Sequence, residues 1–307
     1  MIVDEYALLL AIQSLRQPWL DLAVRALTAL GGTEFTLLVL LGLYWLWPPG
    51  LGLRLILLTL VSAYLNATVK WWLAWPRPAG PDLWVAEPLT SPGFPSGHAQ
   101  NATVLYGYLA WVLRRRWATV LALGLILTVG LSRLYLGVHY PHDVLGGIAL
   151  GALVLLVGIP LLHGSWGERL VRGHPLLLAV GLAGVLLGLL GGDGERSRYA
   201  GALAGLTLGH LWRARRDLPW LLALRPWRPV GLLLSLLVGL GLALALHLVG
   251  LAIGSGPVVV FGRYALLGLV ATGLVPWLFS RWAGSASAVR PPAGRSTTPG
   301  PSGPRGP

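Results

Sequence analysis

Long apolar runs recur along the chain, and they constrain its fold more than any other feature. They lie at about 33–47, 53–70, 98–113, 117–137, 143–162, 175–191, 199–212, 229–253 and 262–280. A transmembrane helix needs roughly 20 mainly apolar residues, so the runs predict an all-α, polytopic membrane helix bundle of about nine spans. Charged residues make up only 11% of the chain, against about 25% in soluble domains.

The segments between these runs divide the chain into four parts. Residues 1–31 mix polar and apolar side chains, so we expect an amphipathic helix pair, broken at Pro18, that lies at the membrane interface. Residues 32–163 hold the first five runs and the polar motifs described below, and residues 164–282 form a four-span C-terminal extension. Residues 283–307 are rich in Pro, Gly and Ser and are expected to be disordered.

The extension offers little chemistry. Glycines recur at every fourth position, at 184, 188 and 192 and again at 201, 205 and 209, which predicts spans that pack closely. Its apolar runs carry no acidic residues. An ion-coupled transporter is therefore poorly supported.

Positive charge predicts the orientation. The net charge is +12 and the isoelectric point is near 11.0. Arginines gather in loops around 114–116, 169–172 and 213–228, which alternate with the nearly neutral segments 193–198 and 254–261. By the positive-inside rule, the arginine loops and the C-terminus face the cytoplasm of a plasma or inner membrane, and segments 71–97 and 138–142 face outside. No soluble domain is left to form a basic groove, so we expect no nucleic-acid partner.

Three polar motifs lie at the ends of predicted spans. Lys70, the only lysine in the chain, closes the second run and is followed by Arg77 and Pro78. Residues 95–98 (PSGH) open the third run, and residues 132–143 (SRLYLGVHYPHD) join the fourth to the fifth. Counting membrane crossings puts all three motifs at one face. We therefore expect them to form one shared site.

The cations of these motifs predict a phosphoryl ligand. Arginine binds phosphate oxygens bidentately and lysine acts as a point charge; the candidates are Lys70, Arg77 and Arg133. Ser96 and Gly97 precede a predicted helix, whose free N–H groups and dipole favour an anion.

The histidines predict how such a ligand reacts. Asp143 follows His139 by four residues, near enough to accept a hydrogen bond from one ring nitrogen and leave the other as a nucleophile. His98 is then the candidate acid for the leaving oxygen. No carboxylate cluster accompanies them and the chain has no cysteine, so we expect no metal. His142 neighbours Asp143 and is expected to have a structural role at the rim.

These motifs resemble a known family. The patterns K-x6-R-P at 70–78, P-S-G-H at 95–98 and S-R-x5-H-x3-D at 132–143 are similar to the three signatures of the type 2 phosphatidic acid phosphatases. Their superfamily includes bacterial lipid pyrophosphatases, glucose-6-phosphatase and vanadium haloperoxidases. The resemblance covers about residues 1–163. It implies a metal-independent phosphohistidine on His139 supported by Asp143, His98 as acid, and phosphate held by Lys70, Arg77, Arg133, Ser96 and Gly97, without a cofactor.

The resemblance implies a membrane-bound lipid phosphatase whose site lies at the outer face. A polyprenyl diphosphate is the first candidate substrate, and phosphatidic acid, phosphatidylglycerol phosphate and diacylglycerol pyrophosphate remain open. A lipid phosphotransferase, which passes the phosphoryl group to an acceptor other than water, is the nearest alternative. A non-catalytic lipid-binding or transport protein is the alternative from another class, although a binder needs cations and no nucleophile.

Overall fold

The protein is helical throughout the described part of the chain. The computed structural model describes residues 4–46, 49–191, 194–216 and 228–278. The first half contains α1 (Glu5–Gln13), α2 (Pro18–Ala29), α3 (Thr33–Leu46), α4 (Pro49–Leu73), α5 (Gly97–Leu113), α6 (Arg116–Tyr135) and α7 (Pro141–His163). The second half contains α8 (Ser165–Val171), α9 (Leu176–Gly191), α10 (Gly194–Ala214), α11 (Arg228–Ile253), α12 (Pro257–Leu269) and the π-helical segment η3 (Val270–Leu274). The predicted disordered tail, 283–307, lies outside the described residues.

Each of the nine predicted apolar runs corresponds to a helix, from α3 to α7 and from α9 to α12. Within the described residues, four helices are long and apolar enough to cross a membrane, or up to six spans if each of two bent helix pairs counts as one. The protein is therefore a polytopic membrane helix bundle with four to six candidate spans.

The N-terminal segment forms two helices, as predicted. The chain leaves the helical path between Gln13 and Pro18, and Pro18 is the first residue of α2, where a proline costs no backbone hydrogen bond. The interfacial position of this pair stays a prediction. Helices α2 and α3 are together apolar enough for one span, bent by 42° at the break between them.

Two loops of the extension are shorter than the sequence predicted. Glu195 and Ser197 were expected in a loop, but α10 begins at Gly194 and includes both. Likewise α12 begins at Pro257, before the expected end of the loop 254–261. The physical reasons are local: an acidic side chain stabilises the first turn of α10, and proline fits the first position of α12.

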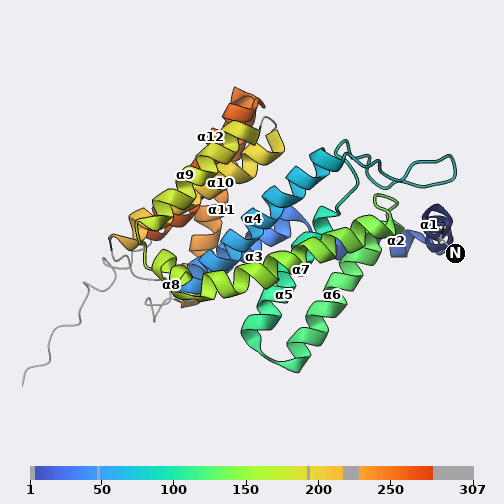
Figure 1. The fold of residues 1–307 in the computed structure, drawn as a ribbon, viewed down its shortest axis with the longest axis horizontal. Coiled ribbons are helices and arrows are strands. Elements are labelled where there is room, and N and C mark those ends of the chain that lie inside the picture. Colours follow the sequence, from blue (N-terminus) through green and yellow to red (C-terminus); the bar gives the residue numbers. More distant parts are fainter. Residues whose placement is uncertain (1–3, 47–48, 192–193, 217–227, 279–307) are drawn as a thin grey trace, which may run out of the picture.

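The extension packs on the first half through buried polar contacts as well as apolar ones. The helices α9, α10 and α12 lie together (yellow to orange in Figure 1), and α10 contacts α4. The hydroxyl of Tyr44 on α3 lies 2.9 Å from His210 Nδ1 on α10, and the indole of Trp45 donates to the carbonyl of Ala271 at 2.7 Å. All three side chains are buried, so the two halves share one core.

Close packing within the extension involves the repeated glycines. A methyl group on Gly201 would collide with the backbone of Phe261, and one on Gly205 would collide with that of Ala265. Both collisions are with α12. The predicted role of these glycines in close helix packing is therefore confirmed.

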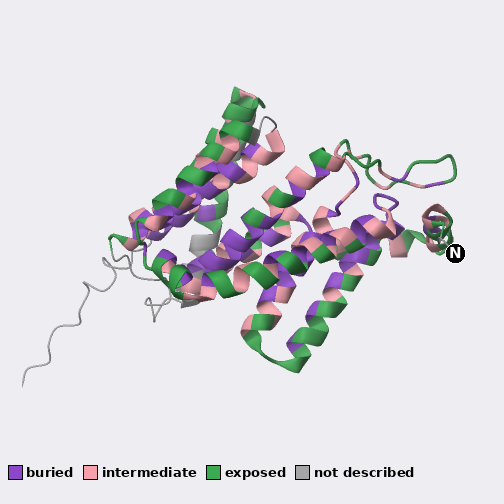
Figure 2. Ribbon diagram, in the orientation of Figure 1, coloured by how far each residue is buried: buried purple, intermediate pink, exposed green. Residues whose placement is uncertain are grey.

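Large apolar side chains point outward along much of the bundle. Leu156 on α7 is 74% exposed and Leu190 on α9 is 80% exposed, and exposed residues line the outer sides of the helices in Figure 2. A soluble monomer rarely exposes so large an apolar surface. The exposed apolar surface of the bundle is thus suited to contact with lipid.

Candidate active site

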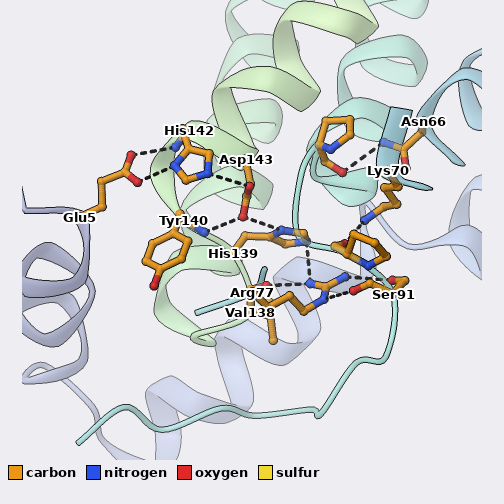
Figure 3. Close-up of polar contacts among 12 residues, drawn as sticks. Glu5, Asn66, Lys70, Arg77, Ser91, Val138, His139, Tyr140, His142 and Asp143 are labelled. Carbon is orange, nitrogen blue, oxygen red and sulfur yellow. Dashed lines mark hydrogen bonds and ion pairs between the residues drawn. The ribbon is translucent and has the colours of Figure 1, made fainter. Parts of the chain in front are cut away.

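The three polar motifs meet at one end of the helices. Lys70 lies in the last turn of α4, residues 95–98 lead into α5, and residues 132–143 include the end of α6 and the start of α7. The backbone N–H of Ser96 donates to the carbonyl of Asp143 at 2.9 Å, which joins the second motif to the third. Figure 3 shows Lys70, Arg77, His139 and Asp143 facing a common region. The expectation of one shared site is confirmed.

His139 lies between a carboxylate and a guanidinium. Its Nδ1 is 3.3 Å from Asp143 Oδ2, and its Nε2 is 3.3 Å from Nη1 of Arg77 (Figure 3). A carboxylate accepts and a guanidinium only donates. The arrangement therefore favours the tautomer with its proton on Nδ1, which leaves the Nε2 lone pair for a reacting atom.

Asp143 is placed by the helix that it begins. Pro141 and Asp143 occupy the first turn of α7, and Asp143 Oδ2 also accepts the backbone N–H of Tyr140 at 2.9 Å. An acidic residue at this helix position binds a free N–H group and suits the helix dipole. The side chain is fully buried. The same capping interaction thus directs one carboxylate oxygen at His139.

The surroundings keep His139 neutral. Burial is the largest cause that lowers the pKa of its imidazole well below the ordinary value, followed by the positive charges of Arg77, Lys70 and Arg133, and then by His98. Burial also lowers the pKa of Arg77, while the Asp143 carboxylate acts to raise it. A neutral imidazole has a free lone pair that can attack an electrophile, and the surrounding cations can attract an anion.

Three cationic side chains surround this region, and each comes from a different segment of the chain. Arg77 donates to the carbonyls of Ser91 and Val138, both at 2.7 Å. The ammonium of Lys70 donates to the carbonyl of Pro92 at 2.8 Å. Arg133 donates from Nη1 to Thr28 Oγ1 at 2.9 Å. These contacts order the side chains without neutralising them, because every acceptor is uncharged.

Three buried polar atoms in the site have no hydrogen-bond partner among the described residues, namely Arg133 Nε, Ser96 Oγ and Asp143 Oδ1. Buried polar groups are nearly always paired, so each such atom calls for an explanation. A donor on an arginine and a hydroxyl at the start of a helix both suit an anionic oxygen.

His98 and Gly97 occupy the first turn of α5, as predicted. His98 is half-buried, and no hydrogen bond is recorded for its side chain within the described residues. A methyl group on Gly97 would meet only the Asn66 side chain, at an ordinary contact distance of 3.5 Å. Packing inside the protein therefore does not require glycine there, and its role toward a ligand stays a prediction.

The sequence analysis missed a buried polar network that supports the second motif. Asn66 on α4 donates to Gln100 Oε1 at 2.7 Å and to the carbonyl of Pro95 at 3.3 Å. Gln100 donates in turn to the Ser62 hydroxyl at 2.7 Å. The signal was present: Ser62, Asn66 and Lys70 recur every fourth residue, which places them on one face of a helix.

The arrangement combines a neutral imidazole, three fixed cations and a second histidine. These are the parts needed to bind a phosphoryl group and transfer it to a protein side chain. Among the described residues there is no group of three or more His, Cys, Asp or Glu side chains placed to hold a metal ion.

Comparison with known proteins agrees with this class of site. The pattern of the PAP2 superfamily matches residues 51–166, and that described as "PAP2 superfamily phosphatase, transmembrane extension" matches residues 197–287. Phosphatidylglycerophosphatase B of Bacillus subtilis is 33% identical over 156 residues, which cover 47% of this chain and 75% of that protein. A crystal structure of a transmembrane PAP2-type phosphatidylglycerolphosphate phosphatase from Bacillus subtilis is 32% identical, covering 50% of this chain and 82% of that one, with a TM-score of 0.45.

A longer match is with sphingosine-1-phosphate phosphatase 1 of Mus musculus, 29% identical over 248 residues. It covers 78% of this chain and about half, 54%, of the mouse protein. The fold and site define a multi-pass membrane phosphatase. The chain belongs to the PAP2 superfamily, and the second matched region shows that it carries the superfamily's transmembrane extension.

Proposed function

We propose that the protein hydrolyses a lipid phosphate or diphosphate through a phosphohistidine on His139, without a metal ion. The observation that carries the proposal is the placement of His139, with Nδ1 facing Asp143 and Nε2 facing Arg77, each at 3.3 Å. The names of the relatives support a lipid phosphate substrate, because both the bacterial and the mouse protein are phosphatases of such compounds.

The first step forms the covalent intermediate. The lone pair of His139 Nε2 attacks phosphorus while the bond from phosphorus to the lipid oxygen breaks. Burial, followed by the charges of Arg133, Lys70 and Arg77, lowers the pKa of His98 to about 3. His98 therefore carries the acidic proton when the anionic phosphoryl group is bound and offsets these charges. It gives that proton to the leaving oxygen, and Asp143 stabilises the positive charge that develops on the His139 ring. Lys70, Arg77 and Arg133 hold the other phosphoryl oxygens, whose charge is spread in the transition state.

The second step restores the enzyme. His98, now neutral, takes a proton from a water molecule, and the resulting hydroxide attacks phosphorus. The bond between phosphorus and Nε2 breaks, inorganic phosphate leaves, and both histidines return to their starting forms. Ser96 Oγ and the N–H groups at the start of α5 assist by binding phosphoryl oxygens in both steps.

The first candidate substrate is a polyprenyl diphosphate, since such carrier lipids are recycled at the outer face of a membrane. Phosphatidic acid, phosphatidylglycerol phosphate and diacylglycerol pyrophosphate are the alternatives. Purified protein in detergent should release phosphate from one of these lipids in excess EDTA, and the His139→Ala variant should not. Activity that EDTA abolishes would contradict the metal-independent route. Release that requires an acceptor other than water would indicate a phosphotransferase, and binding without release would indicate a lipid-binding protein.

The site is proposed to face outside, with the C-terminus in the cytoplasm. In support, the arginine-rich turn at 114–116 joins the ends of α5 and α6 that are opposite the site. The sequence has no cysteine, so a thiol reagent can label only a cysteine that is introduced by substitution. A membrane-impermeant maleimide added to intact cells should label Asp82→Cys, in the loop 74–96, and leave Arg115→Cys unlabelled. The reverse pattern would overturn the orientation.

A further inference from the structure

His142 lies between two carboxylates from different helices (Figure 3). Its Nδ1 is 2.5 Å from Glu5 Oε2 on α1, and its backbone N–H donates to Glu5 Oε1 at 3.1 Å. Its Nε2 is 3.1 Å from Asp143 Oδ1. A chain of contacts therefore runs from Glu5 through His142 and Asp143 to His139.

Both ring nitrogens of His142 face carboxylate oxygens, Nδ1 facing Glu5 and Nε2 facing Asp143. The ring therefore lies between the two acidic side chains and connects them. Aromatic rings surround the same imidazole, with ring centroids 5.4 Å away for Trp75, 5.5 Å for Tyr140 and 6.3 Å for Phe94. These rings pack around the imidazole and limit its movement between the two carboxylates.

The two oxygens of Asp143 are held differently. Oδ2 accepts the N–H of Tyr140 and faces His139. Oδ1 is buried and makes no hydrogen bond of full geometry within the described residues. Its ion-pair contact is His142 Nε2 at 3.1 Å, so His142 limits rotation of the carboxylate, and such rotation would carry Oδ2 away from His139.

Glu5 is presented by a well-anchored helix. Asp4 caps the start of α1, because its carboxylate accepts the backbone N–H groups of the next turn. At the other end, the Gln13 side chain donates to the carbonyls of Trp84 at 2.7 Å and Tyr135 at 3.0 Å. Leu9 between them is fully buried. Helix α1 is thus fixed to the end of α6 and to the loop 74–96, beside the site.

We propose that His142, held by Glu5, is a positioning residue for the reaction at His139, an inference that rests on the proposed function. It acts through Asp143: the His142 ring, 3.1 Å from Oδ1, restricts the carboxylate, so that Oδ2 stays aligned on Nδ1 of His139. This role differs from the structural role at the rim that the sequence alone favoured. Helix α1 then contributes to the reaction indirectly, because its Glu5 contacts His142 and completes the chain of contacts to His139.

Variants of His142 and Glu5 test the proposal through phosphate release from the preferred lipid. His142→Ala should lower kcat about 10-fold with KM within about 2-fold, because the alignment of the nucleophile is lost and substrate contacts are not. His142→Gln keeps a donor toward Asp143 and should lose only about 3-fold. Glu5→Gln should lower kcat by about the same factor as His142→Gln. Asp82→Asn, which removes an exposed acid from the nearby loop, is the matched control and should keep the full rate.

A double-mutant cycle separates positioning from general destabilisation. In an Asp143→Asn background, His142→Ala should change kcat by less than about 2-fold, because the effect acts through the carboxylate. An effect of equal size in both backgrounds, or an unchanged kcat in His142→Ala alone, would overturn the proposal.

A spectroscopic readout needs no turnover. In protein labelled with ¹⁵N-histidine, the downfield proton on His139 Nδ1 reports its hydrogen bond to Asp143. It should move upfield in His142→Ala and stay in place in Asp82→Asn. An unmoved resonance in His142→Ala would also overturn the inference. If wild type released no phosphate and the resonance still moved in His142→Ala, the proposed function would be refuted, while the effect of His142 on the His139–Asp143 contact would stand.

Discussion

Replacing Asp143 with asparagine isolates the charge of the residue that supports His139. The amide has nearly the same shape, so its oxygen can still accept the N–H of Tyr140, which lies 2.9 Å from Asp143 Oδ2. What is lost is the negative charge opposite the imidazole, 3.3 Å from Nδ1. Asp143→Asn therefore keeps the fold of the first turn of α7 and removes the stabilisation of a positive ring.

The magnitude follows from Coulomb's law. Two unit charges about 4 Å apart at an effective dielectric constant of about 20 interact by roughly 4 kcal/mol. A tenfold change in rate corresponds to about 1.4 kcal/mol, so full loss of the interaction costs about 10³ in kcat. The amide dipole recovers part of this, and we expect a fall of about 10²- to 10³-fold, with KM within about 3-fold because the phosphate-binding cations are untouched.

The assay is steady-state phosphate release with the preferred lipid in mixed micelles. Asp21→Asn is the matched control, because Asp21 is likewise held by side-chain contacts, with Arg16 at 2.8 Å and with the Tyr135 hydroxyl at 2.6 Å. That variant should lose stability and keep kcat. A folded Asp143→Asn protein with kcat within about 3-fold of wild type would refute the reasoning.

Three further predictions concern packing, binding and pH. Gly147→Val should lower the free energy of unfolding by about 1–3 kcal/mol, since its side chain would collide with the Ser96 carbonyl, and thermal unfolding measures this. Arg77→Lys should raise KM about 10-fold, because lysine keeps the charge and loses the fork that binds Ser91 and Val138; initial rates test it. Acid should destabilise wild type more than His139→Gln, as melting temperatures at pH 5 to 8 would show.

The pH prediction rests on the direction of the His139 pKa, which lies well below its ordinary value in the folded protein. The unfolded chain therefore takes up a proton near pH 6.5 while the folded protein does not, and stability falls as pH drops below that value. Equal acid sensitivity of wild type and His139→Gln would contradict it.

The packing and binding predictions have their own controls. Gly124→Ala adds a methyl group where no atom lies within 4 Å, so it should not destabilise the protein. Equal losses of unfolding free energy in Gly124→Ala and Gly147→Val would contradict the prediction that close packing at Gly147 excludes a side chain. An Arg77→Lys variant with unchanged KM would show that charge alone binds the phosphoryl group.

The sequence predicted the helices and the meeting of the motifs well, because both depend on local signals. Apolar runs of sufficient length locate helices in a membrane protein, and counting crossings placed Lys70, His98 and His139 at one end of the bundle. The capping position of Asp143 also follows from its place after Pro141.

Other features depend on contacts between distant segments, and spacing cannot reveal them. The pairing of Glu5 with His142 joins residues that the chain separates by 137 positions. The hydrogen bond from Asn66 to the carbonyl of Pro95 depends on how α4 packs beside α5. The sequence showed only that polar residues recur every fourth position on α4. The short loops before α10 and α12 were missed because helix ends are set by capping as much as by hydropathy.

The most direct test of the account is to trap the intermediate. Wild-type protein should be mixed with a lipid diphosphate that carries ³²P in its terminal phosphoryl group, in excess EDTA, and quenched in alkali within milliseconds. We predict label that is stable to alkali, labile to acid, located on His139 and absent from His139→Ala. Turnover without any protein-bound label, or equal labelling of His139→Ala, would contradict the central claim that His139 carries the phosphoryl group.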